Sequence, residues 1–282
     1  MQAVHINGAD IAYRVEGSSE NPLIITLHGG RGFGNHAGDF KAYSALSDTY
    51  RVLSFDMRGH GESSVTGPFT FQQLTDDIDA LRQHFAGEMG KVIILGGSFG
   101  GYLAQQYAIQ YSQHVSHLIL RGTAPSWHHE DGALKRLTER LSKAPLASKE
   151  MLVNGVFEKF ESDEHFRLVM FALGPLYSEA TYDPNASLAG NLKTKFRAEV
   201  HNDLYGPSQK HFDYRASLKD LATPTLVIVG EKDWICPPDE SRAIADAVAN
   251  SKLVIVENAN HGVHLEKNKQ VLDCIRGFLG AS

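Results

Sequence analysis

The segment Gly-Gly-Ser-Phe-Gly-Gly at positions 96–101 constrains the fold more than any other part of this chain. It directly follows the apolar run 92–95 and directly precedes a helix-like stretch, 102–110. A strand, a sharp turn and a helix are therefore expected in succession, because Gly96 and Gly100 leave room for a tight bend around a serine. The hydroxyl of Ser98 would then stand clear of the backbone at the positive end of a helix dipole. We interpret Ser98 as a candidate nucleophile.

Glycine-rich turns after strands also bind phosphates, so this segment alone leaves another interpretation open. The phosphate pattern G-x-x-x-x-G-K-[ST] does not occur in the chain, and the segment lacks the G-x-G-x-x-G order of a dinucleotide site. A strand-to-helix turn without chemistry remains the plain alternative. A nucleophilic serine needs a base, a carboxylate that orients the base, and donors for the oxyanion, so the rest of the chain must supply them.

The composition of the chain indicates which partners and which cellular location to expect. The 282 residues are 42% hydrophobic, enough for one large α/β domain or a domain with an insertion. The net charge of -6 speaks against nucleic acid or acidic membranes as partners. The chain has no apolar run of membrane-spanning length and no signal-like start, so we expect a cytoplasmic protein. Cys236 and Cys274 are too few for a disulfide framework, and the histidines lack metal-site spacing, so we expect no metal and no cofactor.

Buried strands and helical stretches alternate along most of the chain. Apolar runs at 23–27, 52–55, 92–95, 118–120, 226–229 and 253–256 are typical of strands covered on both faces. This alternation predicts an α/β fold with a mostly parallel, doubly wound sheet. The alternation stops between 125 and 213, where only helical spacings occur and where we expect the aromatic side chains to form mainly a core of their own. We therefore predict a core made of residues 1–124 and 214–282, with a helical insertion, 125–213.

Two later strands end in loops that supply the base and its carboxylate. Asp233 follows the strand 226–229, and His261 follows the strand 253–256. Parallel strands bring both loops to the same edge of the sheet as Ser98, and the chain order is serine, aspartate, histidine. Two alternatives stay open: His264 as the base, although it is placed to start the last helix, and Glu231 as the carboxylate.

The oxyanion donors are expected from two loops. The segment His28-Gly29-Gly30 follows another central strand, and its glycines allow a backbone N–H to approach a bound carbonyl oxygen closely. We predict that the N–H groups of Gly30 and Phe99 form the oxyanion hole.

With these loops in order, the chain resembles the α/β-hydrolase-fold enzymes. Within that superfamily it most resembles the proline iminopeptidase branch, including the tricorn-interacting aminopeptidases, whose loop has the pattern H-G-G-P-G and whose elbow has G-G-S-[YFW]-G-G. The segments that carry the resemblance are the elbow, 28–30, 56–63, 230–233 and 260–261. The resemblance implies that 125–213 is a cap over the site, and that carboxylates of the cap hold the terminal ammonium of the substrate.

The chain departs from that pattern at two places. Arg31 stands at the proline position of H-G-G-P-G, where it either binds an acidic group of the substrate or, as is more common, is solvated. After the Gly-Pro pair at 206–207, where an acid is expected, the chain has Gln209 and Lys210, and an unpaired lysine there would repel an ammonium. Other acids of the insertion keep the peptidase hypothesis open: Glu158, Glu161, Glu179 and Glu199.

Three hypotheses on function follow. The first is a serine hydrolase that cleaves a small carboxylic ester, lactone or amide through an acyl-enzyme on Ser98. The second is an exopeptidase that removes proline from the N-terminus of a short peptide by the same chemistry. The third is a small-molecule receptor or a lyase on the same fold. Gly29, Arg31 and Trp234 are the candidate substrate contacts.

Overall fold

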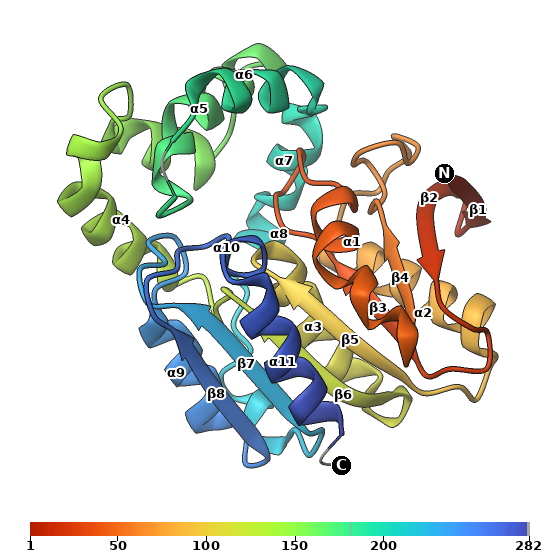
Figure 1. The fold of residues 1–282 in the computed structure, drawn as a ribbon. Coiled ribbons are helices and arrows are strands. Elements are labelled where there is room, and N and C mark those ends of the chain that lie inside the picture. Colours follow the sequence, from red (N-terminus) through yellow and green to blue (C-terminus); the bar gives the residue numbers. More distant parts are fainter. Residues whose placement is uncertain (181, 281–282) are drawn as a thin grey trace.

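One eight-stranded sheet forms the framework of the computed structural model, which describes residues 1–180 and 182–280 (Figure 1). The strand order is β1-β2-β4-β3-β5-β6-β7-β8. β2 pairs antiparallel with β1 and with β4, and all the other pairs are parallel. The predicted doubly wound, mostly parallel sheet is confirmed. The strands are β1 (Gln2–Ile6), β2 (Ala9–Glu16), β3 (Leu23–Leu27), β4 (Arg51–Phe55), β5 (Val92–Gly97), β6 (Val115–Arg121), β7 (Thr225–Gly230) and β8 (Ser251–Val256).

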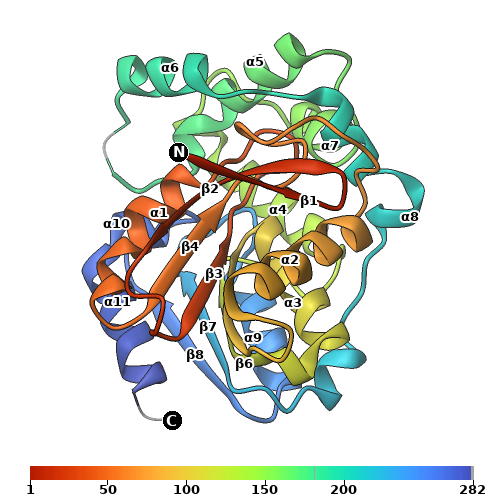
Figure 2. The ribbon, with the colours of Figure 1, turned by 90° about the vertical axis from the view of Figure 1, so that its right-hand side faces the viewer.

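Helices cover both faces of the sheet, which explains the uninterrupted apolar runs. Figure 2 shows α1 (Ala37–Tyr43) and α11 (Asn268–Leu279) on one side, with α2 (Phe71–Ala86), α3 (Phe99–Gln110) and α9 (Pro238–Ala247) on the other. Successive residues of β3 point to opposite faces, so Ile24 packs in the cluster that contains Val271 of α11, whereas Ile25 packs in the one that contains Leu103 of α3. A strand with both faces covered needs apolar side chains at every position.

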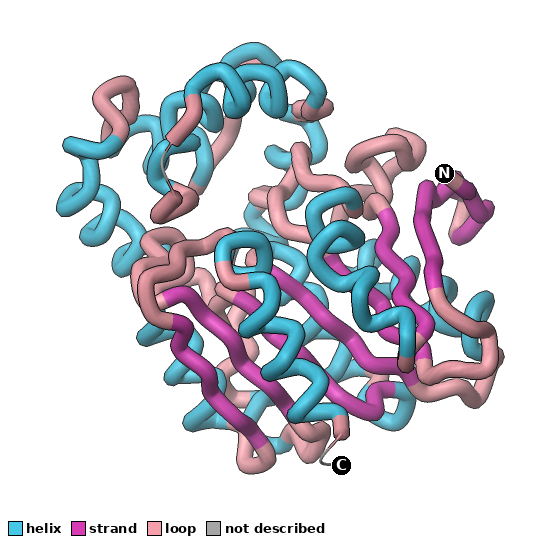
Figure 3. The backbone as a smooth tube through the Cα atoms, viewed as in Figure 1, coloured by secondary structure: helices cyan, strands magenta, loops and turns pink. Residues whose placement is uncertain are grey.

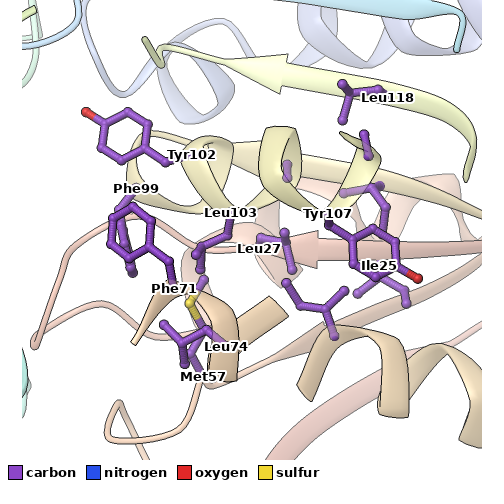
Figure 4. Close-up of a cluster of buried hydrophobic side chains, with 14 of the residues drawn as sticks. Ile25, Leu27, Met57, Phe71, Leu74, Phe99, Tyr102, Leu103, Tyr107 and Leu118 are labelled. Carbon is purple, nitrogen blue, oxygen red and sulfur yellow. The ribbon is translucent and has the colours of Figure 1, made fainter. Parts of the chain in front are cut away.

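The larger core lies between the sheet and the helices α2 and α3 (Figure 4). The rings of Phe99 and Tyr102 lie at the end of α3 that is nearest the elbow, while Tyr107 lies further along the helix, beside Ile25. The elbow helix is thus anchored by fully buried side chains along its length, and burial of each large apolar side chain contributes about 1.5–3 kcal/mol. This packing holds the first turn of α3, and with it Ser98, in a fixed position against the sheet.

The segment between β6 and β7 forms the predicted helical cap above the carboxyl ends of the strands (Figures 1 and 3). Apolar residues recur at helical spacing in the sequence at 133–141, 149–160 and 164–173, which predicts three helices; the structure has α4 and α5 at the first and third places and a π-helical turn, Met151–Val156, at the second. Three further cap helices lay outside the prediction. The cap helices are α4 (His129–Arg140), α5 (Asp163–Leu173), α6 (Pro184–Lys193), α7 (Ala198–Leu204) and α8 (Pro207–Lys210).

The chain enters and leaves the cap side by side. Ser126 and Asp213 form an isolated antiparallel bridge, the N–H of Trp127 donates to the carbonyl of Phe212 at 3.0 Å, and the N–H of Tyr214 donates to that of Pro125 at 2.8 Å. This paired neck supports the division into 1–124, 125–213 and 214–282, which stays a prediction. Beyond β8, the short helix α10 (Val263–Glu266) leads into α11.

Candidate active site

Ser98 occupies a strained turn between β5 and α3. Its backbone has φ 53° and ψ -123°, in the left-handed half of the Ramachandran plot that non-glycine residues rarely adopt. The surroundings hold it there: its N–H donates to the carbonyl of Arg121 at 2.9 Å, and its own carbonyl accepts from the hydroxyl of Thr123 at 2.8 Å. The sharp turn expected from the G-G-S-F-G-G segment is present, and Ser98 lines a cavity.

Each glycine of the turn lies against a different neighbour. A Cβ on Gly96 or Gly100 would overlap backbone carbonyls, those of Gly100 and Leu27 respectively, which is the close approach expected of this motif. A Cβ on Gly97 would overlap the guanidinium of Arg121, and one on Gly101 would overlap the side chain of Thr123. Gly96 and Gly100 therefore let the turn close, while Gly97 leaves space for the charged side chain of Arg121 directly behind Ser98.

Asp233 and His261 meet across the ends of β7 and β8. Nδ1 of His261 donates to Oδ2 of Asp233 at 2.8 Å, because a carboxylate offers only acceptors. The other oxygen of Asp233 accepts from the N–H groups of Ile235 at 3.1 Å and Cys236 at 2.9 Å. Asp233 is fully buried, whereas the side chain of His261 is 12% exposed. This bond fixes the tautomer of His261 with Nε2 unprotonated, the form that a general base requires.

Two buried polar side chains brace His261 from behind. The side-chain oxygen of Asn260 accepts the backbone N–H of His261 at 2.8 Å, and its amide donates to the carbonyl of Leu176 at 2.8 Å. Arg121 donates to the backbone carbonyl of His261 at 3.3 Å and lies 3.6 Å from Asp39. The sequence reasoning missed Arg121, although a charge at the end of a predicted buried strand was a usable signal.

The two competing assignments occupy other places. Glu231 is exposed and accepts the N–H of Asn258 at 3.2 Å. His264 lies in α10, where its ring stacks on Tyr43 and its Nε2 is 3.7 Å from Asp39, and burial lowers its pKa. His264 also lines the cavity, but it is His261 that binds the buried carboxylate of Asp233.

Gly29 and Gly30 bring the loop after β3 against Ser98. A Cβ on Gly29 would lie 2.9 Å from the Cβ of Ser98, and Gly30 has φ 84°, a conformation that favours glycine. Phe99 is the first residue of α3, so its N–H has no acceptor within the helix. His28 fixes the loop, since its Nδ1 donates to the carbonyl of Gly29 at 2.9 Å while its Nε2 accepts from Met57 at 3.2 Å.

The loop at 56–63 supports this arrangement from outside the cavity. The carboxylate of Asp56 accepts the N–H groups of His36 and Glu62, each at 2.7 Å. The ring of His60 accepts the N–H of Gly32 at 2.7 Å, and burial lowers the pKa of His60 to about 3, so the ring stays neutral and keeps its acceptor. The conformation of the glycine loop thus depends on a neutral histidine.

A cavity of about 740 Å³ lies between the core and the cap. Its core wall includes Ser98, His261, both glycines of the 29–30 pair and Arg31. Its cap wall is mainly aromatic and apolar, so the expectation that the aromatic side chains of the insertion serve mainly its own core holds only in part. The lining residues from the cap are His129, Val156, Phe157, Phe166, Met170, Tyr177, Gly190, Thr194, His201 and Tyr205.

Two of the candidate substrate contacts, Arg31 and Trp234, are buried. Burial is unusual for an arginine. Arg31 is 6% exposed, and its guanidinium lies 3.8 Å from the ring centroid of Tyr205, so the interpretation as a solvated side chain is wrong. Rings from distant parts of the chain surround it, and sequence patterns do not reveal such an assembly. Trp234 is fully buried, 5.2 Å from the ring of Tyr177 between core and cap, and does not line the cavity.

The acids of the cap do not converge on Ser98. Lys210 pairs with Glu158, so it is not an unpaired cation that would repel an ammonium. Glu179 pairs with Arg140 and Lys143. Among the residues that the structure describes, Asp39 is the single carboxylate that lines the cavity. No three His, Cys, Asp or Glu side chains in the described ranges group together as metal ligands.

These features define a hydrolase built on a doubly wound sheet, with a serine elbow and a cap. The chain matches the family model for the alpha/beta hydrolase fold over residues 22–268, and it belongs to that family. Within the family it is proline iminopeptidase-like. It is 58% identical over 279 residues, 99% of each chain, to proline iminopeptidase PfmaB of Pestalotiopsis fici. It is also 28% identical to a proline iminopeptidase of Saccharolobus solfataricus, over 95% of this chain and 87% of that one.

A solved structure supports the fold alone. The meta-cleavage product hydrolase CumD from Pseudomonas fluorescens superposes with a TM-score of 0.75 at 18% identity, covering 100% of this chain and 98% of that one. In the part of the chain that the structure describes, every helix is too short or too polar to cross a bilayer.

Proposed function

We propose that this hydrolase works through a covalent acyl-enzyme on Ser98, with His261 as the general base and Asp233 as the residue that orients it. The single observation that carries the proposal is the 2.8 Å bond between Nδ1 of His261 and Asp233, in a loop that lines the same cavity as Ser98. Strands β5, β7 and β8 end at one edge of the sheet, which is where α/β proteins assemble their sites.

The proposed reaction has two halves. The hydroxyl of Ser98 attacks the substrate carbonyl as Nε2 of His261 takes its proton, and the N–H groups of Gly30 and Phe99 stabilise the oxyanion. His261 then donates that proton to the leaving group, which departs and leaves the acyl-enzyme. A water molecule, deprotonated by His261, then attacks the acyl carbon; as the acid leaves, His261 passes the proton to the oxygen of Ser98 and both side chains are restored. Loss of one oxyanion donor would lower kcat by a factor of about 10²–10³.

We propose short peptides with N-terminal proline as the first substrate class; on them the protein would act as an exopeptidase that removes the proline. Its support is the likeness to proline iminopeptidase PfmaB, which is 58% identical over 99% of this chain. The pairing of Lys210 with Glu158 removes one objection, because a paired lysine repels a nearby ammonium less than a free one.

A second class, a small ester, lactone or amide without a free amine, is favoured by the charges of the cavity. Among the described residues, its wall has one carboxylate, Asp39, and that carboxylate already faces Arg121 at 3.6 Å. A protonated amine bound in a low-dielectric site needs an anionic partner. The cations Arg31 and Arg121 also line the wall, and both oppose a positively charged substrate.

Turnover of matched substrates tests the two classes. Proline and acetyl-proline, each coupled to 4-nitroaniline, are compared with a short-chain ester and a lactone. A preference of orders of magnitude for free proline supports the exopeptidase, and cleavage of the ester or lactone without cleavage of proline supports the second class. A wild-type protein that turns over none of the four, with Ser98→Ala giving the same traces, contradicts the hydrolase mechanism and points to a receptor.

A further inference from the structure

Arg31 differs from the other buried arginines of this protein. Arg58 forms a two-pronged pair with Asp77, Arg82 pairs with Asp79, and Arg121 faces Asp39. Arg31 is buried as they are, yet among residues 1–180 and 182–280 no carboxylate lies within 4.0 Å of its guanidinium. A buried charge without a partner is costly, so an arginine in this state calls for a physical explanation.

The surroundings of Arg31 compensate its charge only in part. Besides Tyr205, the rings of Phe99, Tyr102 and Phe71 lie 5.3, 5.4 and 5.5 Å from the guanidinium carbon. Cation–π contacts of this kind act on the faces of the guanidinium and leave the N–H groups in its plane unsatisfied. One N–H donates to the carbonyl of Leu204, at the long distance of 3.5 Å. A guanidinium has five donors, so most of this capacity is unused.

Two polar groups beside Arg31, the hydroxyl of Tyr102 and the ring of His129, are already satisfied by other partners. The hydroxyl of Tyr102 donates to Nε2 of His129 at 3.0 Å, because Nδ1 of that ring donates to the carbonyl of Ser126. His129 stays neutral, since burial lowers its pKa to about 4 and Arg31 lowers it further. His201, whose pKa burial lowers to about 3, is neutral as well. Neither ring therefore adds a second positive charge beside Arg31.

Glu130 is the acid of the cap that faces this group from α4. Tyr205 is one of the groups that influence the pKa of Glu130, which burial raises to about 7 while Arg31 opposes that rise. Near neutral pH its carboxyl is therefore only partly ionised. The ion-pair distance of 4.0 Å is not reached, and the charge of Arg31 is left for another anion. Glu130 escaped the sequence reasoning, because nothing local distinguishes it from a solvated helix residue.

Arg31 lies next to the reacting centre. It directly follows Gly30, and its guanidinium lies against the ring of Phe99, so both proposed oxyanion donors belong to residues that adjoin it. It lines the cavity together with Ser98 and His261. An anion bound to its free N–H groups would lie in the same cavity as the scissile carbonyl.

We infer that Arg31 is the anchor for an anionic group of the substrate, a carboxylate that the guanidinium binds through two N–H groups. The inference rests on the proposed function, since it places the anion on a molecule that Ser98 attacks. The carboxylate has two sources: the acyl part of the substrate, as in a half-ester of a dicarboxylic acid, or the leaving group, as at the C-terminus of a dipeptide with N-terminal proline. In either case the natural substrate is an acid.

Two matched pairs of substrates test this and distinguish the sources. Phenyl hydrogen glutarate and phenyl methyl glutarate differ only in a carboxylate on the acyl part. Pro-Ala and Pro-Ala amide differ only in a carboxylate on the leaving group. The wild type is expected to favour the acid of one pair, and Arg31→Gln is expected to lower that ratio of kcat/KM about 10- to 100-fold, as for lost bonds to a charged group. Arg31→Lys should retain part of the ratio, because it keeps the charge without the planar fork.

Lys210→Gln is the matched control, since it removes a cap cation that does not line the cavity, and it should leave the ratio unchanged. If Arg31 only clamps the cap onto the core, Arg31→Gln lowers kcat/KM for acid and neutral member equally, and the inference is overturned.

Calorimetry separates this inference from the proposed chemistry. Ser98→Ala protein is titrated with each substrate, and then Ser98→Ala/Arg31→Gln is titrated in the same way. Tighter binding of the acid that disappears with Arg31 supports the anchor even if the wild type hydrolyses none of the four compounds. Equal binding of acid and neutral compound to Ser98→Ala overturns the anchor, even if wild-type turnover bears out the serine mechanism.

Discussion

The edge of the sheet and the cap hold their side chains by different means. At the sheet edge, polar groups are fixed by short hydrogen bonds. Asp233 accepts two backbone N–H groups as well as the Nδ1–H of His261, and the side chain of Asn260 accepts the backbone N–H of that histidine. The cap wall of the cavity is held mainly by rings and apolar side chains, such as Phe157 and Met170. Directional bonds fix positions closely, whereas apolar packing tolerates exchange of similar volumes. The comparison therefore assigns the proposed chemistry to the sheet edge, and the choice of substrate to the cap wall together with Arg31 of the glycine loop.

The strongest test of this division compares Ser98 with a cap residue of the same cavity. Ser98→Ala is expected to lower kcat by a factor of about 10⁴–10⁶, because no other group forms the acyl-enzyme. Met170→Ala should change KM and substrate preference by about tenfold or less, the usual effect of a few methylene groups in an apolar pocket. Steady-state kinetics on one good substrate measures both. A loss in Met170→Ala as large as that in Ser98→Ala would break the comparison.

A smaller effect is expected from Gly97→Ala, which tests the core side alone. The new Cβ would overlap the guanidinium of Arg121 and push it away from the carbonyl of His261. Overpacking of this kind costs about 1–3 kcal/mol of unfolding free energy, and we expect kcat to fall about 10- to 100-fold through the displaced histidine. Denaturant unfolding and kinetics provide the two values.

A double-mutant cycle shows whether Arg121 transmits the effect. Arg121→Ala lowers stability by itself, because it leaves Asp39 without its cation. If the overlap is the cause, Gly97→Ala should cost much less in the Arg121→Ala background than in the wild type. Equal costs in both backgrounds would assign the effect of Gly97→Ala to the backbone of the elbow instead.

The pH dependence of stability involves both regions. Burial lowers the pKa of His60 in the core to about 3, and those of His129 and His201 in the cap to about 4 and 3. In the unfolded chain histidine titrates near pH 6.5, so between about pH 6.5 and 4 the unfolded state binds more protons than the folded state. Stability should therefore fall on acidification, by up to about 1.4 kcal/mol per pH unit for each histidine. Glu130 opposes this trend, because its pKa of about 7 is raised by burial.

Denaturant midpoints measured between pH 7.5 and 4.5 give the change of stability with pH. Single variants show how much of that change comes from the core and how much from the cap. His60→Asn and His201→Asn should each make the slope shallower. A slope that responds to His60 but not to His201 would mean that the cap has already opened at the midpoint.

The smallest expected effect comes from two helical glycines at which an added Cβ has free space. A Cβ on Gly277 of α11 or on Gly190 of α6 would meet no atom within 4 Å. Replacement of a mid-helix glycine by alanine stabilises by about 0.5–1 kcal/mol. If core and cap unfold together, Gly277→Ala and Gly190→Ala raise the melting temperature equally. A rise with Gly277→Ala alone would show that the cap unfolds first.

The strands of the core and their loops could be predicted because burial on both faces leaves a clear pattern. Asp233 and His261 follow from topology, since parallel strands end at one edge. Even there, β6 begins at Val115, before the predicted 118–120, because polar Ser116 and His117 interrupt the apolar run. The catalytic roles of Asp233 and His261 stay a prediction.

The second half of the cap was harder to predict, because α7 and α8 are short and α6 has no buried residue. None of the residues of α6 is buried, so it has no apolar stripe to find, although Asp183 and Pro184 mark its start by a cap and a proline at the first turn. The burial of Arg31 depends on rings at positions 71, 99, 102 and 205, which no local pattern brings together.

The paired neck of the cap has a consequence for how such a protein can change over generations. Because Ser126 and Asp213 lie in register, the segment between them begins and ends at nearly one point of the core. An insertion with adjoining ends can lengthen, shorten or be replaced at an entropic cost that grows only slowly with its length, and it does not shift the register of any strand. Descendants of one ancestor can therefore keep the same reaction while they evolve caps that accept different substrates.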